Sequence, residues 1–115
     1  MNSTQRKFND LLIETVDTVL SSLGEPIKNQ LYTNLLNDFS MEKNNIPERI
    51  DEFSKMLHLI FGSAAFLIDI RFMNELHTKC SQLGYTLEYN LEFANADFSF
   101  PSYVVKMREQ YEKLK

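Results

Sequence analysis

Hydrophobic residues recur along most of the chain at intervals of three and four positions, the period of an α-helix that buries one face. The stretches that follow this pattern lie near residues 4–23, 26–39, 46–61, 64–83 and 101–114. Gly24 closes the first stretch and Pro26 opens the second, which predicts a short link between two antiparallel or sharply angled helices. The pattern predicts a mainly α protein, a compact bundle of about five helices.

The third predicted helix has a clear start signal. Asn45 can cap it, and Pro47 suits the first turn because its missing N–H is no loss there. Glu48 stands three residues after Asn45, as a capping box requires, so we expect the helix to begin at residue 46. Gly62 and the small residues at 63–65 then interrupt the pattern, which predicts a helix–helix corner. The alternative is a small-residue face where a helix of a second subunit comes close.

One acidic residue lies inside an apolar helix face. A projection at 100° per residue places Asp69 between Met73, Leu76 and Cys80 on the fourth predicted helix. A buried carboxylate must be neutralised, paired or hydrogen-bonded, or must face a cavity or subunit boundary that admits water. The same helix is apolar over most of its circumference between residues 64 and 73, which is typical of a central or interface helix. On its far side, Arg71 and Glu75 form an i, i+4 pair.

The hydrophobic period changes from helical to two after Gly84. From Tyr85 to Phe93 apolar and polar residues alternate without a break, which predicts a half-buried strand. A single strand leaves its backbone groups unpaired. We therefore expect it to pair with residues near 98–100, giving a short hairpin within 85–100, or with the same strand of a second subunit.

Composition and charge narrow the classes of function. The 115 residues, 43% apolar and 12% aromatic, fit one globular helical domain over residues 1–115. A formal charge of −4 without any basic run disfavours nucleic-acid binding. The sequence has no P-loop, dinucleotide fingerprint or zinc-ligand spacing, so we expect neither a cofactor nor a metal. The single cysteine, Cys80, and the lack of a signal core or a long apolar run predict a soluble cytoplasmic protein that does not bind membranes.

Several short motifs resemble a known family. These are Leu23-Gly24-Glu25, Tyr32, Leu35, Ile46-Pro47, Phe53, Ile60-Phe61-Gly62, Ala64 and Ile68-Asp69-Ile70. The chain is similar over residues 20–83 to the small archaeal helical domains described as Nitrosopumilus-type output domains. Its C-terminal segment, residues 98–111, is similar to that family in general character. The resemblance implies a helical domain without assigned activity, found alone or attached to prokaryotic signalling proteins, which relays a signal by contact.

The leading functional hypothesis is a non-catalytic protein-interaction or signalling output module of archaeal type that forms a homodimer. An apolar helix with more than one apolar face, an unpaired strand and the lack of a catalytic arrangement of residues point to it. The interface residues that this hypothesis predicts are Gly62, Ala64, Ala65, Leu67, Ile68 and Phe72.

Two other functions remain open. The first is a small-molecule-binding domain with an apolar pocket between helices, anchored by Asp69 and lined by Tyr32, Phe53, Phe66 and Met73. Plain core packing explains each of these residues as well. The second is an enzyme in which Asp69 works with His77 or Tyr32 as acid and base, which would require a displaced pKa.

Overall fold

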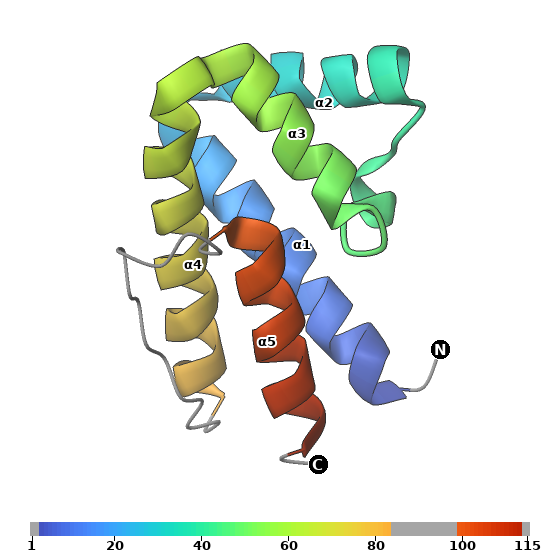
Figure 1. Ribbon diagram of the computed structural model, residues 1–115, viewed down its shortest axis with the longest axis vertical. Helices are drawn as coiled ribbons and strands as arrows, with labels where there is room; N and C mark the ends of the chain where they lie inside the picture. The colour runs from blue at the N-terminus through green and yellow to red at the C-terminus, as the bar shows by residue number, and fades with distance from the viewer. Residues whose placement is uncertain (1–2, 84–98, 114–115) are drawn as a thin grey trace.

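The computed structural model describes residues 3–83 and 99–113, and these form a compact bundle of α-helices (Figure 1). The helices are α1 (Ser3–Leu23), α2 (Glu25–Phe39), α3 (Ile50–Phe61), α4 (Ala65–Gln82) and α5 (Phe100–Lys113). Two short 3-10 turns, η1 (Lys43–Asn45) and η2 (Gly62–Ala64), precede α3 and α4. The predicted mainly α class is confirmed. The predicted strand at 85–93 lies outside the described residues, and Phe100 opens α5 instead of ending a hairpin.

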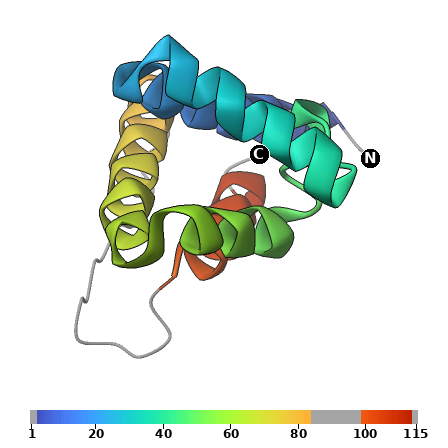
Figure 2. The same cartoon turned by 90° about the horizontal axis from the view of Figure 1, so that it is seen from above.

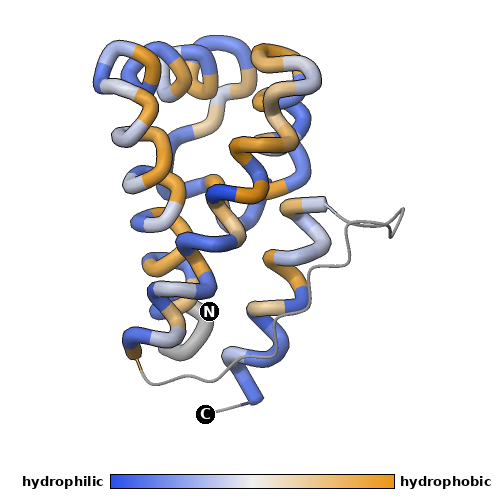
Figure 3. The backbone as a smooth tube through the Cα atoms, turned by 90° about the vertical axis from the view of Figure 1, so that its left-hand side faces the viewer, coloured by the Kyte–Doolittle hydropathy of each residue, from blue (hydrophilic) through white to orange (hydrophobic). Residues whose placement is uncertain are grey.

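The helices pack around α1 and α4, which make the most extensive helix–helix contact. Helix α2 folds back along α1 after Gly24, and α3 lies on the other side of the bundle (Figure 2). Helix α5 fits beside α1, α3 and α4, so residues from both ends of the chain share one core. Figure 3 shows hydrophobic and hydrophilic residues alternating within the turns of the described helices, as the helical period requires.

Aromatic rings connect the helices inside the core. The ring of Phe72 on α4 lies 4.9 Å from that of Phe100 on α5 and 6.0 Å from that of Phe53 on α3, measured between centroids. Near the other end of the bundle, Phe8 and Tyr111 contact each other at 5.5 Å. Tilted ring pairs at these separations are favourable beyond the area they bury. All five side chains are almost completely buried.

Helix α3 begins at Ile50, four residues after the predicted start near residue 46. The Oδ1 atom of Asn45 accepts a hydrogen bond from the backbone N–H of Glu42 at 2.9 Å, and the Glu42 side chain caps the backbone N–H of Asn45 in return. Asn45 is thus used within η1. The side chain of Arg49 donates to the carbonyl oxygen of Phe39 at 2.9 Å, which ties this turn to the end of α2.

The predicted corner between the third and fourth helices is confirmed. Gly62 ends α3 with φ 59° and ψ −132°, a conformation that favours glycine, and α4 starts three residues later. The 33-residue stretch Ile50–Gln82 is long and apolar enough to cross a membrane by length and composition, because it contains an 18-residue window with a mean hydropathy of 1.6. This is weak evidence for a membrane span, since 39% of that window is buried inside the protein and Gly62 divides the stretch into two helices.

Candidate functional site

Four large apolar side chains lie exposed around the α3–α4 corner. We call this set the corner surface: Leu59 (73% exposed), Ile60 (43%), Phe66 (43%) and Leu67 (64%). Between Lys55 and Asp69 the sequence has no aspartate, glutamate, lysine or arginine, so the helix ends that form this surface carry no such side chain. Clustered exposed apolar side chains are typical of sites where another molecule binds.

The corner surface exists because both helices are apolar on more than one face. On α3, Phe53 and Leu57 fill the core, while Leu59 and Ile60 come from the remaining circumference. On α4, Ala65, Ile68 and Phe72 point inward. The next positions along the helix, Phe66 and Leu67, are therefore turned to the outside, as the helical period dictates.

An apolar groove adjoins the corner surface. It has a volume of about 310 Å³ and lies between α2 and the end of α3. Its lining residues are Pro26, Ile27, Gln30, Leu31, Asn34, Ile60 and Phe61. Ile60 belongs to both the groove and the corner surface, and Ile27 on the opposite wall is 42% exposed. The corner surface thus combines projecting apolar side chains with a neighbouring apolar hollow.

A histidine–aspartate pair joins the two helices at the corner. The Nε2 atom of His58 lies 3.0 Å from Oδ2 of Asp69. The His58 side chain is 48% exposed, whereas that of Asp69 is 6% exposed. The Oδ1 atom of Asp69 is buried and has no hydrogen-bond partner among residues 3–83 and 99–113. Burial raises the pKa of Asp69 above its ordinary value, and the hydrogen bond with His58 lowers it by less.

The His58–Asp69 pair has the geometry in which a carboxylate orients an imidazole. Catalysis by such a pair needs a nucleophile or a substrate within hydrogen-bond reach of the ring. Within residues 3–83 and 99–113, no hydroxyl or thiol hydrogen-bonds to His58. The pair therefore acts first as a polar connection between α3 and α4.

The residues predicted to line a pocket around Asp69 occupy different surroundings. Phe53 and Met73 are buried in the core, and Asp69 is buried beside His58. Phe66 belongs to the corner surface. Phe53 and Met73 pack against other core side chains, so they are not exposed to a pocket beside Asp69.

Tyr32, the fifth residue of the predicted pocket, belongs to a polar cluster between α1 and α2. Its hydroxyl donates to Oδ1 of Asp17 at 3.0 Å, and Nζ of Lys43 lies 3.1 Å from the same oxygen. Burial and the neighbouring carboxylate raise the pKa of Tyr32. Burial alone would raise the pKa of Asp17, but the hydrogen bonds from Lys43 and Tyr32 together lower it. This cluster connects two helices and shows no unpaired acid or base.

The predicted interface residues divide into two groups. Gly62, Ala64 and Leu67 are exposed and lie at the corner. Ala65, Ile68 and Phe72 are buried within the chain itself. These three belong to the core because the inward face of α4 packs against the rest of the bundle, so assigning them to an interface was a misreading of core positions.

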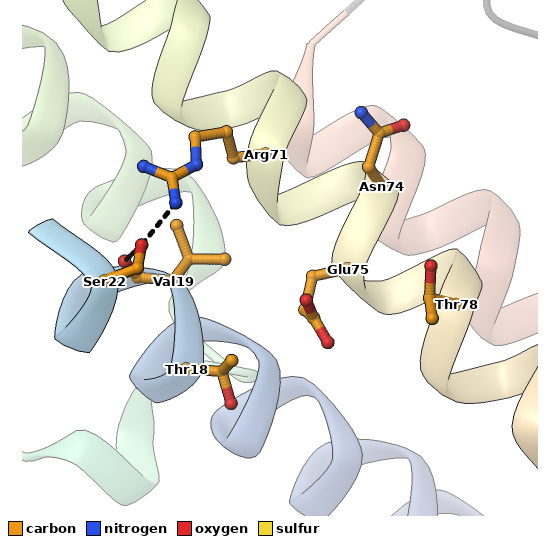
Figure 4. A pocket seen from close by; sticks show the side chains of 7 residues that line it. All are labelled: Thr18, Val19, Ser22, Arg71, Asn74, Glu75 and Thr78. Carbon is orange, nitrogen blue, oxygen red and sulfur yellow. Dashed lines mark hydrogen bonds between the residues drawn. The ribbon is translucent and has the colours of Figure 1, made fainter.

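A second, polar groove of about 320 Å³ lies between α1 and α4 (Figure 4). Its lining residues are Thr18, Val19, Ser22, Arg71, Asn74, Glu75 and Thr78. Arg71 donates a hydrogen bond to the hydroxyl of Ser22. The structure shows no ion pair between Arg71 and Glu75, although the sequence places them one helical turn apart; Nζ of Lys79 lies 3.6 Å from Glu75 instead.

Sequence reasoning missed both His58 as the partner of Asp69 and the polar groove. His58 lies at the margin of the α3 stripe, and a buried acid on the next helix requires a donor, so a signal for the pair was present. The groove depends on how α1 and α4 pack, and those helices are far apart in the sequence. Hydrophobic periodicity along the sequence carries no information on how these two helices pack against each other.

No family model matches this chain, and no curated protein or solved structure was found to match it either. The likeness to Nitrosopumilus-type output domains therefore rests on the quoted residues alone and stays a prediction.

Proposed function

We propose that this protein is a non-catalytic interaction module that forms a homodimer through the corner surface. The observation that carries the proposal is the grouping of Leu59, Ile60, Phe66 and Leu67, all exposed, on a stretch without aspartate, glutamate, lysine or arginine. Burying such side chains against another apolar surface removes them from water and stabilises the complex. A signalling output role, as the resemblance implies, would use this contact to relay a signal.

A second copy of the chain fits this surface because the surface has both projecting apolar side chains and an apolar groove that can receive them. Leu59 and Leu67 project from the corner, and the apolar groove bounded by Ile27 and Ile60 lies next to them. In a two-fold symmetric interface, each residue of one copy can meet a different residue of the other. The projecting leucines of each copy would enter the groove of its partner.

Sedimentation velocity over a range of protein concentrations tests the proposal. We expect the wild type to dimerise and Leu67→Glu to sediment as a monomer, because the new charge would have to be buried in the interface. Val105→Glu is the matched control, since Val105 is 48% exposed but lies on α5, away from the corner. It should leave the dimer intact.

Two outcomes would contradict the proposal. One is a wild-type protein that stays monomeric at the highest soluble concentration. The other is equal loss of the dimer in the Leu67→Glu and Val105→Glu proteins. Circular dichroism of each variant shows that it keeps its helices, so that loss of folding is not mistaken for loss of assembly.

A further inference from the structure

We propose that the polar groove between α1 and α4 binds a small zwitterion of the α-amino-acid class, with Arg71 holding its carboxylate and Glu75 its ammonium group. This site is separate from the corner surface, and the proposal does not depend on the proposed dimer. It starts from the lining of the groove, in which Val19 is the one side chain without a hydrogen-bonding group.

Arg71 is held in place for an anionic group. The hydroxyl of Ser22 donates to the carbonyl oxygen of Val19 at 2.6 Å and accepts a hydrogen bond from Nη2 of Arg71 (Figure 4). This fixes one edge of a guanidinium that carries five N–H donors. No carboxylate of the described residues forms an ion pair with Arg71. A ligand carboxylate could take the remaining donors in the paired geometry that guanidinium favours.

Glu75 provides the opposite charge one helical turn along α4. In Figure 4 its side chain extends toward α1, into the space between the two helices. Residues four apart on a helix have Cβ atoms about 5–6 Å apart. Both side chains therefore line the same groove, where one ligand that carries a carboxylate and an ammonium group can contact them.

The charges around the groove favour a ligand without net charge. Lys79 lies 3.3 Å from Glu14 on α1 and 3.6 Å from Glu75, measured from Nζ to the carboxylate oxygens. With Arg71, these residues make two positive and two negative charges. A free anion would meet Glu75 and a free cation would meet Arg71, whereas a zwitterion matches both.

The size of the groove and its hydroxyl groups narrow the ligand class further. Its volume of about 320 Å³ is at the lower end of small-molecule sites, which span roughly 300–1,000 Å³. Thr18 and Thr78 add hydroxyl groups beyond the charged pair. We therefore expect small polar amino acids to bind better than large or aromatic ones.

A titration followed by ¹H–¹⁵N correlation spectra tests the site on the intact protein. We expect glycine, L-alanine and L-serine to cause saturable shifts in amides of residues 18–22 and 71–78, with a Kd of about 1 mM or below. Acetate and methylammonium each carry one of the two charges. At matched ionic strength they should bind at least about tenfold more weakly, because each meets one like charge.

Variants of the charged pair connect the shifts to the groove. Arg71→Gln and Glu75→Gln should each weaken glycine binding at least about tenfold, and Arg71→Lys should have an intermediate effect because lysine keeps the charge but not the paired donors. Lys55→Gln, which removes an exposed charge on α3, should bind as the wild type does. The Arg71→Lys protein keeps the test valid if Arg71→Gln does not fold.

Four results would overturn the proposal. Three concern the wild type: the lack of saturable shifts up to about 10 mM amino acid, shifts that map away from α1 and α4, and acetate binding as tightly as glycine. The fourth is unchanged binding in a folded Arg71→Gln protein. The sedimentation of these variants reports separately on the proposed dimer, so failure of one proposal is distinguishable from failure of the other.

Discussion

At the scale of single residues, Asp69 is a buried acid of which one carboxylate oxygen is hydrogen-bonded within the described residues and the other is not. Its Oδ2 atom contacts His58, while its buried Oδ1 atom has no hydrogen-bond partner in the described part of the chain. The sequence predicted that Asp69 lies in the buried face of its helix, and that prediction is confirmed. Its partner was missed, although His58 lies at the margin of the preceding helix, because the pairing also depends on the angle at Gly62.

Replacing Asp69 by leucine should leave the free energy of unfolding at pH 7.5 unchanged or raise it by up to about 2 kcal/mol. The variant removes a buried carboxylate, and the half-exposed His58 can form its hydrogen bonds with water. The native pKa of Asp69 is raised, so native wild type binds more protons than unfolded wild type between the ordinary value near 3.9 and the native value. The wild type therefore loses stability as pH rises through that window.

Urea unfolding at pH 4 and at pH 7.5 checks this prediction. The advantage of Asp69→Leu over the wild type should be larger at pH 7.5 than at pH 4, because the raised pKa of Asp69 makes the wild type lose stability as the pH rises. Asp10→Leu, which changes an exposed carboxylate on α1, should alter the free energy of unfolding by less than about 0.5 kcal/mol. A leucine variant that is less stable than the wild type by more than about 1 kcal/mol at pH 7.5 would mean that Asp69 stabilises the fold.

Cys80 was predicted to be buried, and the structure confirms its burial. Burial raises the pKa of its thiol to about 11. Because the thiolate is the reactive form, a disulfide reagent at pH 8 should label the native protein at least about 100-fold more slowly than the urea-unfolded protein. Equal labelling rates in the two states would contradict both the burial and the raised pKa.

At the scale of secondary structure, apolar periodicity located five helices. It did not predict the start of α3, where the hydrogen bonds of polar side chains determine the backbone. The signal at Asn45 was read as the cap of α3, but its side chain bonds to the backbone of Glu42 within η1. Arg49 then reaches back to the end of α2, which holds the turn before α3. Periodicity reports which face of a helix is buried and carries little information about these local hydrogen bonds.

Gly62→Ala should lower the free energy of unfolding by about 1–3 kcal/mol. A Cβ atom at residue 62 would meet no atom within 4 Å, so the cost comes from the backbone, whose φ of 59° is strained for alanine. Ser63→Ala, an exposed change in the same turn, should cost less than about 0.5 kcal/mol. Equal values for the two variants in urea unfolding would show that the corner does not require glycine.

At the scale of the whole molecule, the bundle was predictable and the arrangement of its helices was not. Phe8, Phe100 and Tyr111 were each assigned to a helix from the sequence, or placed next to one. Their meeting in one core depends on how α5 packs, and residues 84–98 separate α4 from α5. The corner surface could not be predicted for the same reason. When a helix is apolar on several faces, its sequence does not show which face the neighbouring helices cover.

Arg108 connects three parts of the molecule and should contribute measurably to its stability. Its Nη2 atom lies 3.1 Å from the carbonyl oxygen of Pro47 and 3.4 Å from Oδ1 of Asn9, and its guanidinium lies 5.5 Å from the ring centroid of Phe8. Arg108→Ala should lower the free energy of unfolding by about 1–2 kcal/mol. Glu109→Ala, an exposed neighbour, should change it by less than about 0.5 kcal/mol, and comparable losses would rule out this role for Arg108.

The contact between Phe8 and Tyr111 has a consequence for synthesis of the protein on the ribosome. The ring of Tyr111, which covers Phe8, is added to the growing chain 103 residues after Phe8. At typical elongation rates of about 5–20 residues per second, this interval lasts roughly 5–20 s. During that time α1 has no α5 to pack against, so the part of its apolar face around Phe8 is open to chaperones and to neighbouring nascent chains.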